Sequence, residues 1–379
     1  MRILIFNWKD LTHPAAGGAE VFTEQVAQAL VARGHSVTLF AAAVEGRPDR
    51  ELVEGVEIVR RGGRLGVYRA ARRFWSQQPR GSYDIVIDGI NTRPFLCPRW
   101  IRDTPVVAVI YQLAREIWSY ETPFPVSVLG RYLLEPWWLR TYRGVPALTI
   151  SASSAESLVR HHKWRDLTVV PMGATTHPVP QVSKERDPTL VFLGRFVAMK
   201  RPQDAIEAYR LLVRRFPSAR LWMIGDGPLL ARLRKVGPPG VTLLGRVGRD
   251  EVLDRLARAH VLVSTSVREG WGLNVSEAAA CGTPSIAYSV PGLVDSVEAS
   301  GGALVDPNPE ALGEALADYF SGRIDLQPRL STVPWAEVGE AVERRLNQVV
   351  REAHAPTDRE SEGQDHATSR RRVRRRKRA

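Results

Sequence analysis

The stretch 269–277, EGWGLNVSE, with its continuation AAACGTPSIA to residue 287, decides the fold of the second half of this chain. A short apolar run at 261–264 precedes it and predicts a strand, and the residues from 274 to 281 predict a helix. Seven residues separate Glu269 from Glu277, and the glycines between them expose backbone N–H groups to a ligand. We expect Glu269 on the loop and Glu277 on the helix, where both carboxylates can accept hydrogen bonds from hydroxyl groups.

Outward from this stretch, short apolar runs alternate with helical patterns along the chain. Strands are predicted at 3–6, 35–41, 56–60, 83–88, 105–110 and 148–151, and then at 190–193, 220–224, 241–244, 261–264 and 285–288. Strands that alternate with helices favour parallel sheets covered on both faces. We therefore predict an α/β fold with two Rossmann-like, doubly wound parallel-sheet domains that face a cleft.

The domain boundaries follow from changes in composition. Residues 174–188 are rich in proline and polar groups and show no periodicity, which is typical of a linker. We predict an N-terminal domain at 1–172, a linker at 173–188, a second domain at 189–333, a helix at 334–353 and a disordered basic tail at 354–379.

Composition excludes several classes of protein. Of the 379 residues, 44% are hydrophobic and 25% charged, and no apolar run approaches the ~18 residues of a transmembrane helix. The first ten residues break too early for a signal peptide, so we predict a cytoplasmic protein with both cysteines as thiols. The net charge is +12, but residues 370–378 hold eight basic side chains and leave +4 for the rest. Nucleic acid is therefore an unlikely partner.

Two further loops follow predicted strands, where α/β folds bind ligands. Gly17 and Gly18 allow close approach of the backbone after the first strand, although a plain turn explains them equally well. After the strand at 190–193, Gly194 and Arg195 precede Lys200, and such cations bind phosphate oxygens. A solvated basic loop is the alternative for Arg195 and Lys200.

The sequence contains no Asp-x-Asp motif and no cluster of histidine, cysteine and carboxylate residues. We therefore expect no metal and no cofactor. If a nucleoside diphosphate leaves at this site, Arg195, Lys200 and a helix N-terminus have to stabilise its charge.

These stretches together resemble the family 4 glycosyltransferases, a GT-B group with many bacterial mannosyl- and glucosyltransferases. The similar segments are HPAAGGAE at 13–20, GHSVTLF at 34–40, SASSAESL at 151–158, PMGA at 171–174, GRFVAMKRP at 194–202, GDGP at 225–228 and EGWGLNVSEAAACGTPSIA at 269–287. The resemblance covers roughly residues 1–350, and the final predicted helix resembles the segment that crosses back to the N-terminal domain.

The resemblance implies a retaining transfer of a hexose from a nucleoside-diphosphate sugar to a glycan or lipid-linked acceptor, without a metal and without an enzyme nucleophile. It implies that Arg195 and Lys200 bind the diphosphate, that Glu269 contacts the sugar and that Glu277 binds the ribose. It also implies a donor-binding backbone at Gly17, Gly18, Gly194, Gly270, Trp271, Gly272 and Leu273.

One position departs from the family. Relatives commonly place a histidine in the sugar pocket after the strand at 105–110, where this chain has Tyr111. A tyrosine can donate a hydrogen bond but is a poor base at neutral pH. This departure leaves open a catalytically weak or inactive protein that binds nucleotide sugars. A nucleotide-sugar epimerase is a further alternative, although no evident set of acids and bases supports it.

Two segments suggest a membrane surface as a partner. The segment 125–143 mixes Val, Leu and Trp with arginines, which is typical of an interfacial helix, but we favour a helix packed in the N-terminal domain. The cluster at 370–378 suits an anionic membrane, and a solvated terminus explains it equally well. A peripheral enzyme at the inner face of the membrane would use both segments.

Overall fold

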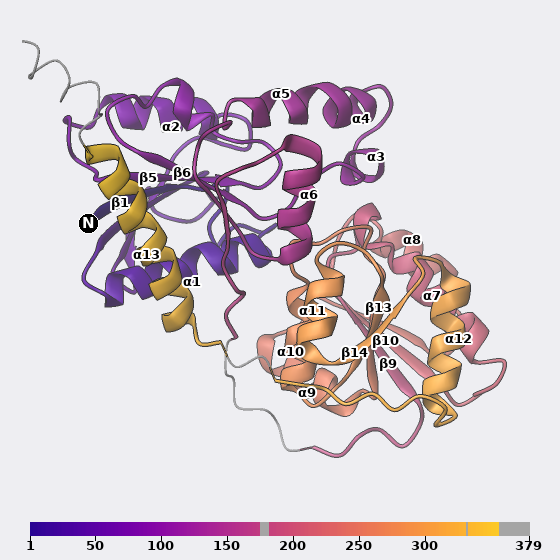
Figure 1. Ribbon diagram of the computed structural model, residues 1–379. Helices are drawn as coiled ribbons and strands as arrows, with labels where there is room; N and C mark the ends of the chain where they lie inside the picture. The colour runs from indigo at the N-terminus through magenta and orange to yellow at the C-terminus, as the bar shows by residue number, and fades with distance from the viewer. Residues whose placement is uncertain (175–181, 331–332, 356–379) are drawn as a thin grey trace, which may run out of the picture.

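The computed structural model describes residues 1–174, 182–330 and 333–355, which form two sheets with helices on both faces (Figure 1). The first sheet has eight strands in the order β3-β4-β2-β1-β5-β6-β7-β8, and all neighbours are parallel except β3 and β4. The strands are β1 (Arg2–Phe6), β2 (Ser36–Ala41), β3 (Arg50–Val53), β4 (Val56–Arg60), β5 (Ile85–Ile90), β6 (Val106–Ile110), β7 (Ala147–Thr149) and β8 (Leu167–Val169).

Helices cover both faces of this sheet, and the first strand explains why. Ile3 and Ile5 of β1 point into a core beneath α1, whereas Leu4 and Phe6 point into a second core beneath α2. The helical elements of this domain are α1 (Gly18–Ala32), α2 (Val67–Ser76), η1 (Cys97–Arg99), α3 (Ile117–Glu121), α4 (Val126–Leu129), η2 (Gly130–Leu134), α5 (Glu135–Arg140) and α6 (Ala152–His162).

The second sheet has six parallel strands in the order β11-β10-β9-β12-β13-β14. They are β9 (Thr189–Leu193), β10 (Arg220–Ile224), β11 (Val241–Gly245), β12 (Val261–Ser264), β13 (Ser285–Tyr288) and β14 (Gly302–Val305). The helical elements are η3 (Ala198–Lys200), α7 (Pro202–Leu212), α8 (Leu230–Val236), α9 (Arg249–Arg258), α10 (Leu273–Ala280), α11 (Leu293–Ser300) and α12 (Pro309–Phe320).

Both sheets have the doubly wound order of a dinucleotide-binding fold, which confirms the predicted fold class. Counted from its own first strand, the second sheet runs 3-2-1-4-5-6, and the parallel strands β4-β2-β1-β5-β6-β7 of the first sheet repeat that order. The strand order reverses between β1 and β5 and between β9 and β12. Ligands bind such folds at the carboxyl ends of the strands beside this reversal.

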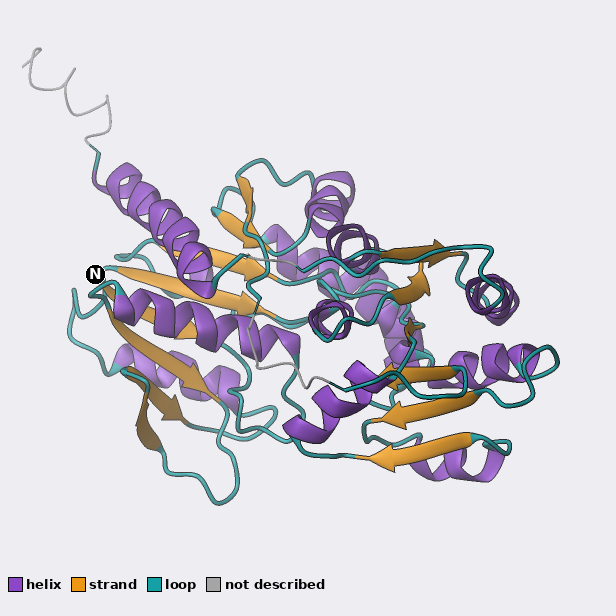
Figure 2. Ribbon diagram, turned by 90° about the horizontal axis from the view of Figure 1, so that it is seen from below, coloured by secondary structure: helices purple, strands orange, loops and turns teal. Residues whose placement is uncertain are grey.

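The last described helix, α13 (Trp335–His354), lies on the N-terminal domain against α1 (Figures 1 and 2). Its apolar stripe, Val338, Val342, Leu346 and Val349, completes the core beneath α1. Glu343 adds an ion pair to Arg33 and a hydrogen bond to His35 Nε2 at 2.8 Å. The chain therefore returns to its first domain after completing the second.

Several elements were not predicted, among them the strands β3, β8 and β14 and the helices α2, α6 and α11. The strand β3 reads RELV and lies at the sheet edge, so it carries no apolar run. Residues 175–181 of the expected linker and nearly all of the expected basic tail lie outside the described residues. The described end of the linker segment is held to the second domain, because Lys184 Nζ donates to Ala259 O at 2.7 Å and to Gly282 O at 3.0 Å.

No helix among the described residues combines the length and the apolar character needed to cross a membrane.

Candidate functional site

Two loops of the second domain meet at its strand reversal. One follows β9 and carries Arg195 and Lys200, and the other follows β12 and carries Glu269. Lys200 Nζ forms an ion pair with Glu269 Oε1, and Ser266 Oγ donates to the same oxygen at 2.5 Å. The structure thus joins two of the predicted site residues, although 69 positions separate them in the sequence.

Side chains beneath the site fix the two loops to each other. Thr265 Oγ1 donates to the carbonyl oxygens of Lys200 and Arg201, at 2.8 and 2.9 Å. Asn274 Nδ2 donates to Leu193 O at 3.1 Å and so ties the start of α10 to the end of β9. The positions of Lys200 and Glu269 are therefore set by strands and helices rather than by free loops.

Arg195 differs from Lys200 in having no carboxylate partner. Its side chain is exposed, and it forms no ion pair with any described residue. It lies close enough to the N-terminal domain to affect Lys9, whose pKa is lowered mainly by burial and further by the charge of Arg195. The guanidinium group is therefore available to an anion at the boundary between the domains.

The glycine-rich turn before α10 also lies at this boundary. Gly272 has a φ of +97°, and a Cβ there would lie 2.9 Å from Leu293 Cδ2 and from Ser296 Oγ. A Cβ on Gly270 would lie 2.8 Å from Tyr111 O of the first domain. Glycine at these positions lets the N-terminus of α10 sit beside the first domain.

The neighbouring residues of this turn contact their own helix and the first domain. Trp271 Nε1 donates to Ser276 Oγ at 2.9 Å. Leu273 faces Gly18, where a Cβ would lie 3.1 Å from Leu273 Cδ1. The structure therefore brings together the predicted residues on the loop after β1 and those at the start of α10.

Glu277 lies on α10, and its carboxylate pairs with Arg249, the first residue of α9, at 2.7 Å. Both side chains are partly exposed. Among the described residues, Glu277 forms no ion pair with Lys200, and its partner Arg249 places its carboxylate between α9 and α10.

The first domain contributes a buried ion pair beneath Gly17 and Gly18. Lys9 Nζ lies 3.5 Å from Glu20 Oε1 and donates to Ala15 O at 2.6 Å. Glu20 Oε2 accepts from the N–H of Gly17 at 2.7 Å. Burial raises the pKa of Glu20, and the nearby Lys9 opposes that shift. The pair holds the loop after β1 against the start of α1.

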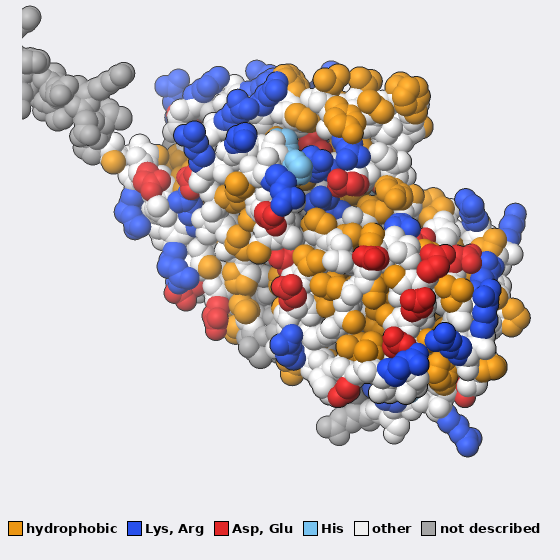
Figure 3. All heavy atoms as spheres, turned by 45° about the vertical axis from the view of Figure 1, so that its right-hand side comes forward, with side chains coloured by type: hydrophobic (Ala, Val, Ile, Leu, Met, Phe, Trp, Pro, Cys, Tyr) orange, Lys and Arg blue, Asp and Glu red, His pale blue; other side chains and the backbone are white. Residues whose placement is uncertain are grey.

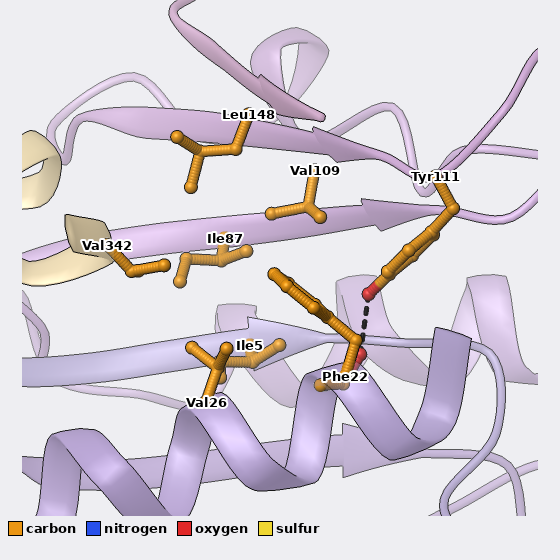
Figure 4. A pocket seen from close by; sticks show the side chains of 9 residues that line it. Ile5, Phe22, Val26, Ile87, Val109, Tyr111, Leu148 and Val342 are labelled. Atoms are coloured by element: carbon orange, nitrogen blue, oxygen red, sulfur yellow. Dashed lines mark hydrogen bonds between the residues drawn. The ribbon is translucent and has the colours of Figure 1, made fainter. Parts of the chain in front are cut away.

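The expected position of Tyr111 in the sugar pocket is wrong for its side chain. Only 4% of the residue is exposed, and its ring points beneath α1 among Phe22, Val26 and Val109 (Figure 4). Its hydroxyl lies 2.5 Å from Thr23 Oγ1, which satisfies it within the core. Burial raises the pKa of this hydroxyl above its usual value. Only the backbone carbonyl of Tyr111 reaches the domain boundary, next to Gly270.

Several polar contacts join the two domains around the site. Ser153 Oγ donates to Asp295 and accepts from Gly292 N at 2.7 Å. Arg268 is buried and pairs with Glu116 at 3.0 Å. Glu121 accepts from the N–H of Met199 at 2.9 Å, one residue before Lys200.

Several residues of the site were missed by the sequence reasoning. Lys9 stands in the loop after β1, where a charge directly after an apolar strand was a usable signal. Ser266 and Asn274 lie within or beside the predicted motif, but polar residues in a loop are common and give no specific signal. Arg249 could have been suspected only from its place at the start of a helix after β11. Among the described residues, no group of three or more His, Cys, Asp and Glu side chains is arranged to hold a metal ion.

Comparison with known proteins identifies the class. Solved structures with the same two-domain arrangement include sucrose-phosphate synthase from Thermosynechococcus elongatus, with a TM-score of 0.69 and 20% identity over 92% of this chain and 94% of that one. Another is WaaG, a glycosyltransferase involved in lipopolysaccharide biosynthesis, with a TM-score of 0.67 and 19% identity over 93% of this chain and 98% of that one. The fold is that of the GT-B glycosyltransferases.

Family models give the narrower assignment. The model described as Glycosyltransferase Family 4 matches residues 16–177, and the model described as Glycosyl transferases group 1 matches residues 174–332. The chain belongs to the family 4 glycosyltransferases, as the resemblance of its motifs predicts.

Two curated relatives illustrate the range of this family. A GDP-mannose-dependent α-(1-6)-phosphatidylinositol dimannoside mannosyltransferase of Mycobacterium tuberculosis is 34% identical over 164 residues, which are 40% of this chain and 43% of the relative. The match thus spans less than half of that relative's length. The D-inositol 3-phosphate glycosyltransferase of Pseudarthrobacter chlorophenolicus is 27% identical over 82% of this chain and 84% of its own length.

Proposed function

We propose that this protein transfers a hexose from a nucleoside-diphosphate sugar to a glycan or lipid-linked acceptor, with retention of the anomeric configuration and without a metal ion. The observation that carries the proposal is that Arg195, exposed and without an ion pair to any described residue, lies on the same loop as Lys200 at the strand reversal of the second domain. Two cations and a helix N-terminus at one place suit a diphosphate.

Arg195 and Lys200 have different roles in binding the diphosphate of the donor. Arg195 can bind two phosphate oxygens at once, and Lys200 acts as a point charge beside them. Both would stabilise the negative charge that develops as the diphosphate leaves, which is the role a metal ion has in other transferases. This chemistry supports the metal-independent form of the proposal.

Glu269 serves the sugar in this proposal. Its carboxylate is oriented by Lys200 and Ser266 and keeps free lone pairs for the hydroxyls of a hexose. Because these two partners hold the carboxylate in place, it acts as a hydrogen-bond acceptor rather than as a nucleophile. The acceptor hydroxyl then attacks from the face that the diphosphate leaves, and a departing phosphate oxygen takes its proton.

Glu277 would bind the ribose of the donor from its place on α10. Its ion pair with Arg249 is partly exposed, so the carboxylate can turn to two adjacent hydroxyls at small cost. GDP- and UDP-linked mannose and glucose are the first donors to try, because the mannosyltransferase relative depends on GDP-mannose. The same relative acts on a phosphatidylinositol glycolipid, which supports a lipid-linked acceptor.

The test is a donor screen with detection of both products. The purified protein is incubated with GDP-, UDP-, ADP- and TDP-hexoses and extracted glycans or glycolipids, with and without EDTA. We expect release of one nucleoside diphosphate that depends on the acceptor and persists in EDTA, and an NMR spectrum of the product with the anomeric configuration of the donor.

Other outcomes separate the alternatives. Inversion of the anomeric centre or loss of activity in EDTA would contradict that part of the proposal. An isomerised donor without any acceptor would indicate an epimerase. Nucleotide-sugar binding without turnover on any acceptor would indicate an inactive binding protein.

A further inference from the structure

Exposed apolar side chains gather on one part of the first domain. Of the sixteen large hydrophobic residues that are exposed in the described chain, nine lie between residues 120 and 137. Phe124 is 81% exposed, Tyr132 62% and Leu133 61%. Figure 3 shows hydrophobic side chains along the upper edge of this domain, beside a group of Lys and Arg side chains. Soluble surfaces rarely collect apolar groups in this way without a partner.

In the helical run formed by α4, η2 and α5, small and polar side chains face the domain and most large apolar side chains face outward, the opposite of an ordinary packed helix. Its buried residues are Ser127, Gly130, Glu135 and Leu139, of which only Leu139 is large and apolar. Its exposed large apolar residues are Val126, Val128, Leu129, Tyr132, Leu133, Leu134 and Trp137. The expectation that this segment packs its apolar residues in the domain is therefore wrong.

Specific contacts fix which side faces inward. A Cβ on Gly130 would lie 2.3 Å from the Trp118 ring, so only glycine fits there. Glu135 accepts hydrogen bonds from the N–H groups of Ala114 and Arg115, at 2.6 and 2.9 Å. Rotating the run to bury Tyr132 and Leu133 would break these contacts. The outward direction of the apolar side chains is thus part of the fold.

A basic groove adjoins the apolar surface. It is an open groove of about 450 Å3, lined by Pro98, Arg99, Arg102, Trp137, Arg140 and Thr141. The Arg99 guanidinium lies 4.4 Å from the centre of the Trp137 ring. Arg99, Arg102 and Arg140 form no ion pair with any described residue. Three unpaired guanidinium groups around a tryptophan suit a phosphate group at an apolar boundary.

We propose that the surface formed by residues 120–140 docks on an anionic phospholipid membrane, with Tyr132, Leu133 and Trp137 in the interface and a lipid phosphate in the groove of Arg99, Arg102 and Arg140. Apolar and aromatic side chains flanked by arginines match the boundary between acyl chains and headgroups. A second copy of the chain fits less well, because a symmetric contact would bring the same unpaired arginines together.

The proposal is tested by sedimentation of the full-length protein with vesicles of phosphatidylcholine, with and without phosphatidylglycerol. Leu133→Asp removes the apolar contact, and the double variant Arg102→Ala, Arg140→Ala removes charge from the groove. Leu52→Asp is the matched control on the far edge strand β3, and Arg214→Ala is the control for charge. Nucleotide affinity in solution shows that each variant keeps its fold and its second domain.

We expect binding to anionic vesicles that weakens by at least about tenfold in Leu133→Asp and roughly 10–30-fold in the double arginine variant. Both control variants should bind as the unchanged protein does. Vesicle binding that is unaffected in Leu133→Asp and in the arginine variant would overturn the proposal and assign binding to the basic segment 370–378. A dimer that Leu133→Asp converts to a monomer would overturn it in favour of contact between two copies.

Discussion

The loops after β1 and after β9 occupy equivalent places at the strand reversals of their two sheets, but their cations differ. Lys9 of the first domain is 4% exposed and is neutralised by Glu20. Arg195 of the second domain is exposed and forms no ion pair with any described residue, whereas Lys200 on the same loop pairs with Glu269. Topology therefore brings cations to both places. Lys9 and Lys200 each pair with a glutamate, and only the second place adds a cation, Arg195, that no carboxylate of the described residues neutralises.

This comparison assigns the donor phosphates to the second domain and a supporting role to the Lys9 pair. A buried, paired cation contributes to the shape of the loop at Gly17 and Gly18 but has little attraction left for a phosphate. Water solvates an exposed cation well in the free protein. Its attraction to a phosphate becomes stronger when the bound ligand excludes that water.

The largest expected effect is on catalysis by Arg195→Ala and Lys200→Ala. Each variant should lower the rate of nucleoside diphosphate release by about 10²–10³-fold, because charge on the leaving group loses a preorganised partner. The measurement is kcat/KM with the donor that the screen identifies. Arg214→Ala, an exposed arginine beyond the end of α7, should be unaffected. Full activity in Lys200→Ala would contradict the proposed role of Lys200 at the leaving diphosphate.

Glu269→Gln should affect transfer more than binding of the nucleotide. Loss of the charge leaves Lys200 without its partner and weakens the hydrogen bonds to the sugar, which we expect to cost about 1.5–3 kcal/mol, or roughly 10–150-fold in kcat/KM. Calorimetric titration with the nucleoside diphosphate alone should give a Kd close to that of the unchanged protein. A variant that loses nucleotide affinity but transfers sugar normally would contradict the proposed role.

Lys9→Met should instead lower stability. It leaves the carboxylate of Glu20 buried without its cation, so we expect a loss of about 1–3 kcal/mol in the free energy of unfolding. Urea denaturation at neutral pH measures this, and Arg195→Ala is the matched variant, with an expected change within about 0.5 kcal/mol. Equal stabilities for the two variants would contradict the claim that Lys9 stabilises the fold whereas Arg195 does not.

Glu277→Ala should weaken nucleotide binding by about tenfold with little loss of stability. Its ion pair with Arg249 is partly exposed and contributes about 0–1 kcal/mol to folding, whereas lost bonds to the ribose act on the ligand alone. With deoxyribose nucleotides, the Kd of the variant should lie closer to the Kd of the unchanged protein. A difference in Kd as large as with ribose nucleotides would place Glu277 away from the ribose.

The smallest expected effect concerns the first domain at low pH. Burial, with smaller contributions from His161 and nearby arginines, lowers the pKa of His162 to about 4. The unfolded chain binds a proton near pH 6.5, so this group favours the folded state above that pH and loses its contribution as the pH falls toward 4. His162→Gln should flatten the decline of stability across this window in denaturation curves. An unchanged slope would show that His162 titrates normally.

The sequence predicts the second domain better than it predicts the contacts of the first. The strands β10, β12 and β13 match the predicted bounds, because each combines an apolar pattern with clear breaks. Lys200 and Glu269 were both singled out from their motifs. Their ion pair follows from the adjacency of β9 and β12, which a doubly wound order implies.

Side-chain direction explains most of what the sequence could not predict. Tyr111 points beneath α1 because Thr23 lies there, and those two residues are 88 positions apart. The contact of Ser153 with Asp295 depends on how the domains dock, over 142 positions. The apolar residues around Leu133 face outward because Gly130 and Glu135 occupy the inner face. A pattern of apolar residues cannot distinguish a core from an exposed surface.

The most direct test of this account is calorimetric titration of the nucleoside diphosphate into the unchanged protein, Arg195→Ala, Lys9→Met and Arg214→Ala at one fixed salt concentration. We predict that Arg195→Ala weakens binding by about tenfold or more, because a hydrogen bond to a charged phosphate is lost. Folded Lys9→Met and Arg214→Ala should bind within about twofold of the unchanged protein, since neither side chain reaches the phosphates. Affinity that is lost in Lys9→Met but kept in Arg195→Ala would place the phosphates on the first domain and contradict the account.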